Sequence, residues 1–143
     1  MPKLVPCLSF KGQCNEAIEL YKVTFGAKVR EKILFKDANS EDFECKVGEE
    51  DFVFYSQITI GGKRMDLADD SMGLLDETVK GKANNVSFIV EFNSDEELND
   101  AYKLLYDEAT ILTPMTSTTY CTAYVVLEDK FGVCWQLMSG FAG

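Results

Sequence analysis

The stretch VVLEDKFGVCWQLM, residues Val125–Met138, decides how the end of this chain folds. Apolar residues stand on both sides of a turn signal at Asp129 and Gly132. Two apolar runs separated by such turn residues are typical of neighbouring antiparallel strands. The second run contains one polar residue, Gln136. The stretch therefore predicts a hairpin whose closing strand presents a single amide.

An earlier stretch of the chain has the same design. ITIGGKRMDLAD, residues Ile58–Asp69, has Gly61 and Gly62 between its two runs, which predicts a second hairpin. Its closing strand carries Asp66 directly before a leucine, just as the later strand carries Gln136 directly before a leucine. Matching residues at matching places in the two halves indicate an internal repeat.

Each hairpin ends an equivalent series of predicted elements, namely one strand, one helix and three strands. In the first half we expect a strand over 3–10, a helix over Asn15–Phe25 capped by Asn15, and strands over 27–35, 52–60 and 63–69. In the second half we expect a strand over 85–92, a helix over 94–108, and strands over 109–115, 121–128 and 133–138. The series predicts an α+β fold of two βαβββ modules in one domain, with module one at about 1–70, a linker at about 71–83 and module two at about 84–143. The acidic, turn-rich segment 37–51 is expected to be a solvated, mobile surface loop.

Composition limits the partners of the protein. The chain has 143 residues, 46% of them hydrophobic, and 24 acidic against 14 basic residues give a net charge of -10. This charge repels nucleic acid and anionic membrane surfaces, so neither is expected as a partner. No segment approaches the roughly 20 apolar residues needed to span a bilayer, and the N-terminus lacks a signal-peptide pattern. We therefore expect a cytoplasmic protein.

Two residue types limit the chemistry. The chain contains no histidine, so Ser-His and Cys-His catalysis are excluded. Its five cysteines show no C-x-x-C spacing, and free thiols are therefore expected instead of a disulfide framework or a zinc ribbon.

Four segments in order resemble the PhnB-like branch of the vicinal-oxygen-chelate superfamily, which includes glyoxalase I, extradiol dioxygenases and bleomycin-resistance proteins. The segments are PCLSFKGQCNEAIELYKVTFGAKV, ITIGGKRMDLADD, NNVSFIVEF and DKFGVCWQLM. Members of this branch are often labelled 3-demethylubiquinone methyltransferase-like. No glycine-rich loop between a strand and a helix supports methyl transfer with a nucleotide-type cofactor here, and we expect no cofactor.

The resemblance also implies where metal-dependent relatives hold a divalent ion. By matching registers, those positions are Val5, Asp66, Ser87 and Gln136, with Asn85 in place of Ser87 if the register is shifted by two. Only one of these residues is a carboxylate, and a hard or borderline divalent ion requires several strong donors. The expectation is a protein without a catalytic metal.

Strand alternation assigns the candidate site residues to faces. Met65 and Leu67 should pack on a helix, as should Trp135 and Leu137, while the residues between them should line a cavity. The candidate ligand-binding residues are Tyr55, Arg64, Asp66, Ser87, Cys134 and Gln136.

Two functions remain open at this point. One is a metal-free protein that binds a small molecule. The other is a metal-independent enzyme acting on a small carbonyl-type metabolite, with Asp66 or a cavity tyrosine as general acid or base. The polar residues could equally serve only to satisfy one another. Open, curved sheets also lead us to expect a homodimer.

Overall fold

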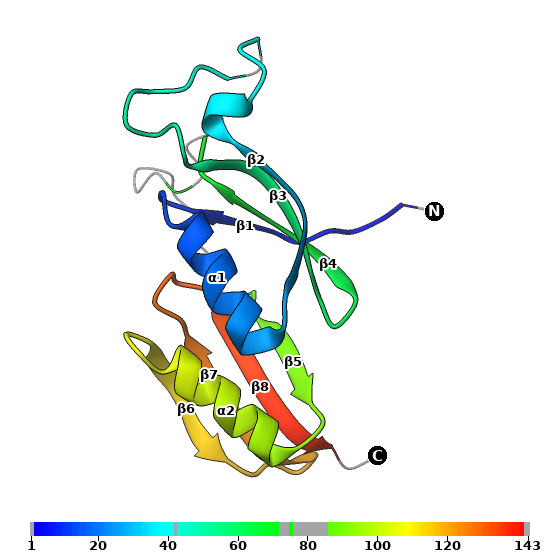
Figure 1. Cartoon of the computed structure of the whole chain (residues 1–143). Coiled ribbons are helices and arrows are strands. Elements are labelled where there is room, and N and C mark those ends of the chain that lie inside the picture. Colours follow the sequence, from blue (N-terminus) through cyan, green and yellow to red (C-terminus); the bar gives the residue numbers. More distant parts are fainter. Residues whose placement is uncertain (1, 42, 72–74, 76–85, 142–143) are drawn as a thin grey trace. The chain divides into compact units, whose positions relative to one another are not determined.

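The computed structural model describes the whole chain except residues 1, 42, 72–74, 76–85, 142 and 143. The described residues form eight strands, two α-helices and one short 3-10 helix (Figure 1). The chain divides into two compact units, Met1–Lys82 (unit 1) and Ala83–Gly143 (unit 2). That the two units make up one domain stays a prediction.

Unit 1 is a four-stranded sheet with one helix. Its elements are β1 (Cys7–Phe10), α1 (Cys14–Phe25), β2 (Lys28–Leu34), the 3-10 helix η1 (Phe35–Asp37), β3 (Val53–Ile60) and β4 (Lys63–Asp69). The strand order is β1-β4-β3-β2, in which β1 runs parallel to β4 and the other neighbours are antiparallel. The predicted hairpin at the Gly61-Gly62 turn is confirmed as the β3–β4 pair.

Unit 2 repeats this arrangement. Its elements are β5 (Phe88–Phe92), α2 (Asp95–Leu105), β6 (Thr110–Thr116), β7 (Cys121–Glu128) and β8 (Cys134–Phe141). The strand order β5-β8-β7-β6 matches that of unit 1, again with one parallel pair, β5 and β8. The predicted α+β fold of two βαβββ modules is confirmed.

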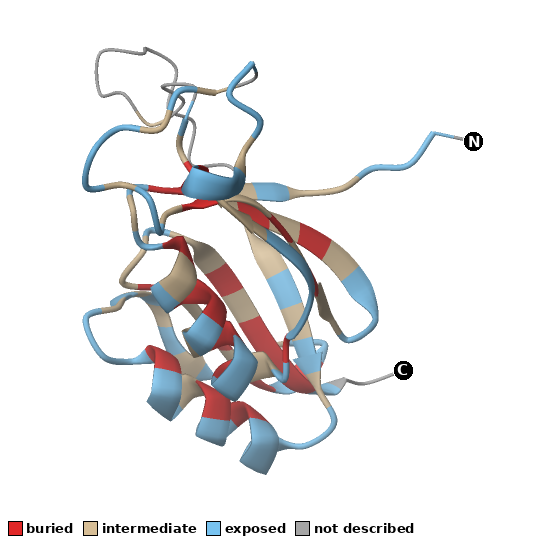
Figure 2. Cartoon of the chain, turned by 45° about the horizontal axis from the view of Figure 1, so that its top comes forward, coloured by how far each residue is buried: buried red, intermediate tan, exposed pale blue. Residues whose placement is uncertain are grey.

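In each unit one sheet face packs against the helix, and most residues of the other face are only partly buried. Met65 and Leu67 of β4 are buried, as are Trp135 and Leu137 of β8, and the strands show alternating buried bands in Figure 2. This alternation follows from the two-residue repeat of a strand, which sends neighbouring side chains to opposite faces. We call the face away from the helix the open face of each unit.

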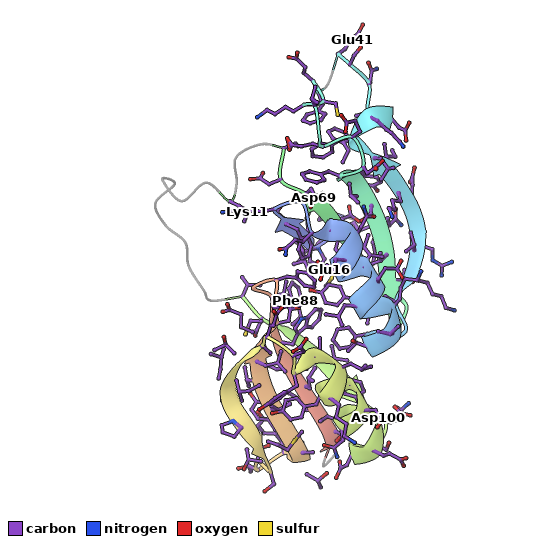
Figure 3. All side chains as sticks on the ribbon, turned by 60° about the vertical axis from the view of Figure 1, so that its left-hand side comes forward. Lys11, Glu16, Glu41, Asp69, Phe88 and Asp100 are labelled. Carbon is purple, nitrogen blue, oxygen red and sulfur yellow. The ribbon has the colours of Figure 1, made fainter. Side chains whose placement is uncertain are left out.

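The start of α1 corrects the sequence prediction. The helix begins at Cys14 and not at Asn15, and its N-cap residue Gln13 makes no side-chain hydrogen bond to the helix. The first backbone N–H instead donates to Asp69 Oδ1 at 3.0 Å, and Figure 3 shows Asp69 beside the start of α1. The cap thus comes from the end of β4, because a distant carboxylate satisfies the helix terminus as well as a local asparagine.

Helix α2 begins as predicted and ends early. Ser94 caps the helix by accepting a hydrogen bond from the backbone N–H of Glu97 at 3.1 Å. The helix ends at Leu105, whereas the sequence predicted that it continues to residue 108. Tyr106 is 59% exposed because it lies past the last helical turn.

The acidic segment 37–51 contacts the rest of unit 1 through an aromatic side chain and a backbone carbonyl. Phe43, in the middle of the segment, contacts Phe35 at a ring-centroid distance of 4.6 Å and Phe54 at 5.3 Å. At the end of the segment, the Asp51 carbonyl accepts a hydrogen bond from Asn15 Nδ2 at 3.0 Å. The described charged residues of the segment are exposed or partly exposed, and the ring contacts of Phe43 connect the segment to unit 1.

Two expectations lie partly outside the described residues. The predicted linker at 71–83 falls mostly, and Asn85 wholly, among residues that the structure does not describe.

Among the described helices, none is both long and apolar enough to cross a membrane.

Candidate functional site

The open face of unit 1 carries a network of four side chains, which we call the unit 1 network. Arg64 Nε donates to Asp66 Oδ1 at 3.0 Å, and Arg64 Nη2 donates to Asp66 Oδ2 at 3.1 Å. The same Nη2 donates to Tyr55 Oη at 3.1 Å, and the Tyr55 hydroxyl donates to Gln57 Oε1 at 3.3 Å. The β3–β4 register pairs Gln57 with Asp66, so alternation brings all four side chains to one face.

The Arg64–Asp66 pair is bidentate and only partly exposed. The Arg64 side chain is 30% exposed and that of Asp66 is 15% exposed. Hydrogen bonding to the carboxylate raises the pKa of Arg64 above its ordinary value. Two parallel charge-assisted bonds fix the plane of the guanidinium and occupy both carboxylate oxygens. Asp66 is therefore half of an ion pair and not a free carboxylate.

The open face of unit 2 carries a shorter chain of hydrogen bonds, the unit 2 network. The Tyr124 hydroxyl donates to Gln136 Oε1 at 2.8 Å, and Gln136 Nε2 donates to Ser87 Oγ at 2.7 Å. Burial is the largest cause that raises the pKa of Tyr124, with the neighbouring Tyr120 second. The phenol therefore stays protonated at neutral pH and acts as a hydrogen-bond donor.

The two networks occupy equivalent positions in the repeat. Asp66 lies opposite Gln57 in the β3–β4 register, and Gln136 lies opposite Val126 in the β7–β8 register. Tyr55 stands two residues before Gln57, and Tyr124 stands two residues before Val126. Each unit thus pairs the polar residue of its closing strand with a network that contains a tyrosine from the preceding strand.

The structure groups most of the predicted site residues. Tyr55, Arg64 and Asp66 meet in unit 1, and Ser87 meets Gln136 in unit 2. Cys134 lies two residues before Gln136 on the same strand, where burial, followed by Glu128, raises the pKa of its thiol. Such a thiol stays protonated and is a weak nucleophile.

Two members of the networks were missing from the sequence-based set. These are Gln57, which accepts a hydrogen bond from the Tyr55 hydroxyl, and Tyr124, which donates a hydrogen bond to Gln136. Alternation around Tyr55 and Gln136 would have identified both as neighbours, provided that the register of each hairpin had been known.

The residues at the four positions implied for a metal do not fit a divalent ion. Val5 offers no side-chain donor, both Asp66 oxygens bond Arg64, and Gln136 Oε1 bonds Tyr124. The remaining oxygen, Ser87 Oγ, already accepts from Gln136. Among the described residues, no three His, Cys, Asp or Glu side chains are grouped so that they could hold an ion. A metal would have to displace these bonds and would gain at most one carboxylate.

The turn between β1 and α1 does not form a cradle for a nucleotide-type cofactor. A Cβ atom at Gly12 would lie 2.7 Å from the ring of Phe52, so this glycine accommodates an aromatic side chain. A glycine that serves a phosphate or a ribose instead leaves the backbone open to the ligand. The glycine here has a packing role.

Comparisons with known proteins agree with the resemblance seen in the sequence. The family described as 3-demethylubiquinone-9 3-methyltransferase matches residues 2–138. Protein YjdN of Escherichia coli (strain K12) is 28% identical over 140 residues, which cover 94% of this chain and 92% of that protein.

Solved structures share the fold. A PhnB protein from Bacillus cereus superposes with a TM-score of 0.76 at 22% identity, covering 96% of this chain and 99% of that one. A glyoxylase/bleomycin resistance protein/dioxygenase domain from Frankia sp. EAN1pec superposes with a TM-score of 0.64 at 11% identity, covering 98% of both chains. The chain therefore belongs to the family described as 3-demethylubiquinone-9 3-methyltransferase, and it shares the fold of the PhnB protein and of the glyoxylase/bleomycin resistance protein/dioxygenase domain.

Proposed function

We propose that this protein binds a small molecule on the open faces of its sheets without a resident metal ion. The observation that carries the proposal is the pair of networks at equivalent positions of the repeat. Each network holds polar groups in fixed orientations on a face that the helix leaves uncovered. A few fixed polar groups on a mostly apolar wall are typical of small-molecule sites.

The same contacts disfavour an enzyme that uses Asp66 or a tyrosine as its base. A general base has to direct an oxygen toward the proton of its substrate, whereas both Asp66 oxygens are directed toward the guanidinium of Arg64. Tyr124 has a raised pKa, which makes it a weaker acid and leaves it protonated. Both groups are suited to orienting a ligand and poorly suited to transferring its protons.

The family's description refers to methyl transfer, and the packing at Gly12 argues against that activity in this chain. A methyl donor of the nucleotide type needs a backbone that it can approach closely, and the Phe52 ring occupies that space. Binding without group transfer is the function that the geometry supports best.

A thermal-shift screen tests the proposal. The protein is heated with a panel of small metabolites, in parallel with and without a chelator. A ligand present at 100 times its dissociation constant adds about 2.7 kcal/mol of stability, which corresponds to a rise in Tm of about 8 °C. Stabilisation that persists in chelator supports the proposal. Stabilisation that requires an added divalent ion would contradict it.

We also propose that the protein works as a homodimer. Each sheet has edge strands and an open face, and such surfaces are commonly covered by a second copy. On the open side of unit 2, Ile89 is 56% exposed, which adds apolar area that association would bury. Sedimentation at micromolar concentration is expected to show twice the chain mass of 16.0 kDa. A single species of the chain mass would contradict the dimer.

A further inference from the structure

The two networks have the same distribution of hydrogen-bond donors and acceptors, which we call their polarity. Their acceptor atoms already accept hydrogen bonds from within the network, whereas some of their donor hydrogens bond no residue that the structure describes. Each occupied acceptor accepts at least one of the hydrogen bonds described above. These acceptors are Asp66 Oδ1, Asp66 Oδ2, Tyr55 Oη, Gln57 Oε1, Gln136 Oε1 and Ser87 Oγ.

The spare donors in unit 1 belong mainly to Arg64. A guanidinium has five N–H groups, and Arg64 uses those of Nε and Nη2 toward Asp66 and Tyr55. Its Nη1 atom bonds no residue that the structure describes. The two bonds to the Asp66 carboxylate fix the plane of the guanidinium, so the N–H groups of Nη1 keep one orientation.

The spare donors in unit 2 belong to Ser87 and Gln136. The Ser87 oxygen accepts from Gln136 Nε2, and its own proton has no acceptor among the described residues. The same holds for the second amide hydrogen of Gln136. Ser87 and Gln136 are both partly exposed, so an acceptor atom of a ligand can reach these donors in place of water.

Some carboxylates on the same faces favour the opposite type of ligand. Glu31 pairs with Gln57 across the β2–β3 register, and Glu128 pairs with Cys134 across the β7–β8 register. Both lie beside the networks and outside them, and Glu31 is exposed to water. An ammonium group attracted there would have to share every acceptor oxygen of the networks with a donor that the oxygen already binds.

From this polarity we infer that the open faces recognise the oxygen-acceptor end of a small molecule, a carbonyl or a carboxylate. Arg64 binds it in unit 1, and Ser87 with Gln136 binds it in unit 2. Asp66 acts as a positioning residue that orients Arg64. The inference rests on the proposed binding function and adds the chemical class of the ligand.

Three probes of similar size that differ in one functional group test the inference. Acetophenone offers a neutral carbonyl, benzoate a carboxylate and benzylammonium a cationic donor. Each is titrated into the full-length protein while two-dimensional NMR follows the backbone amides and the Arg64 Nε–H. Acetophenone and benzoate are expected to shift resonances around both networks, and benzylammonium is expected to leave them unchanged. The ratio of the first two affinities distinguishes a carbonyl from a carboxylate ligand.

Variants assign the donors. Arg64→Gln is expected to weaken binding in unit 1 by about tenfold and to leave unit 2 unchanged, because a charged donor is lost. Ser87→Ala is expected to weaken binding in unit 2 by about fivefold and to leave unit 1 unchanged. Arg30→Gln and Ser117→Ala remove the same groups from exposed positions and should leave both affinities unchanged.

A further variant keeps the test decisive if Arg64→Gln does not fold. Asp66→Asn keeps the shape of the side chain and removes one negative charge beside the guanidinium. One of the two bonds that orient the guanidinium is then lost, so acetophenone should bind unit 1 about threefold more weakly, with its binding to unit 2 unchanged. Unchanged acetophenone binding to unit 1 would contradict Arg64, oriented by Asp66, as the anchor.

The outcomes separate the inference from the proposed function. If benzylammonium binds at either network as tightly as acetophenone, the inference fails and the proposed function stands. The same holds if neither Arg64→Gln nor Ser87→Ala changes the affinity for acetophenone. If none of the three probes shifts resonances at either open face, the proposed binding function fails as well.

Discussion

Asp129 is the residue whose replacement tests the second hairpin most directly. It is 3% exposed and lies in the turn between β7 and β8. Its Oδ1 accepts from the backbone N–H groups of Phe131 at 2.9 Å and Val133 at 3.0 Å, and its Oδ2 accepts from Trp135 Nε1 at 2.9 Å. One buried carboxylate therefore fixes both the turn and the indole beneath the sheet.

The change Asp129→Asn isolates one of these bonds. The amide oxygen can still accept from both backbone groups, but the amide NH2 then faces the indole N–H, so two buried donors point at each other. A lost charge-assisted bond and an unsatisfied buried donor each cost about 1–3 kcal/mol. Because the two costs partly describe the same lost bond, we expect a total loss of about 2–4 kcal/mol in the free energy of unfolding. For a chain of this size, Tm should fall by about 6–12 °C.

Urea unfolding followed by the fluorescence of Trp135 measures the change, because the chain contains one tryptophan. Asp100→Asn, at an exposed position of α2, is the matched control and should cost less than about 0.5 kcal/mol. Combining Asp129→Asn with Trp135→Phe removes the clash between donors, so the double variant should be less destabilised than the sum of the two single variants. Far-UV circular dichroism follows the unfolding of the variants without Trp135, because they contain no tryptophan. A loss below about 0.5 kcal/mol for Asp129→Asn would refute the reasoning.

Two further predictions concern unit 1. Burial and, second, Asp69 raise the pKa of Cys14 from 9.0 to about 12, so its contribution to stability is complete below pH 9.0 and is lost as the pH rises towards 12. The free energy of unfolding should fall by about 1–2 kcal/mol more between pH 9 and about 10.5 in the wild type than in Cys14→Ala, and equal slopes in urea titrations would contradict this. Phe43→Ala should cost about 1–2 kcal/mol because a half-buried ring is lost, and should speed proteolytic cleavage within 37–51. Val47→Ala, at a side chain 98% exposed in the same segment, should do neither, and equal cleavage of both variants would argue against the aromatic anchor.

The fold was accessible from the sequence because its signals are local and occur twice. Alternation in the closing strands placed Leu67 and Trp135 on the helix side, and both are buried. The cap of α1 was not accessible, since Asp69 lies 55 residues away along the chain from Cys14. Local patterns predict elements, whereas the side chains that complete an element can come from any strand that the fold brings near.

Only part of the candidate site could be predicted from the sequence, for a related reason. Asp66 and Gln136 were identified by their equivalent places in the repeat, but their partners depend on the pairing of β3 with β4 and of β7 with β8. That pairing makes Asp66 part of an ion pair with Arg64, which sequence reasoning left as one alternative among several. A residue type indicates what a side chain can do, and its neighbours decide whether it is free to do it.

Gln136→Glu tests whether a change of donor alone can restore a metal site. In the unit 2 network, Tyr124 can still donate to one carboxylate oxygen, and the Ser87 hydroxyl can rotate to donate to the other. The variant should therefore fold with a loss of less than about 1.5 kcal/mol, since hydroxyl donors replace an amide donor.

The new carboxylate would nevertheless be bonded on both oxygens, and the other members of the unit 2 network, Tyr124 and Ser87, would supply only hydroxyl groups as further ligands. A divalent ion loses more hydration than one carboxylate with neutral oxygens returns, so calorimetric titration with zinc, nickel, manganese or magnesium should give no dissociation constant below about 0.1 mM. Gln13→Glu adds the same charge at an exposed position and serves as the control. Stoichiometric binding in the micromolar range by Gln136→Glu, but not by Gln13→Glu, would mean that the fold still holds a metal geometry and lacks only one strong ligand.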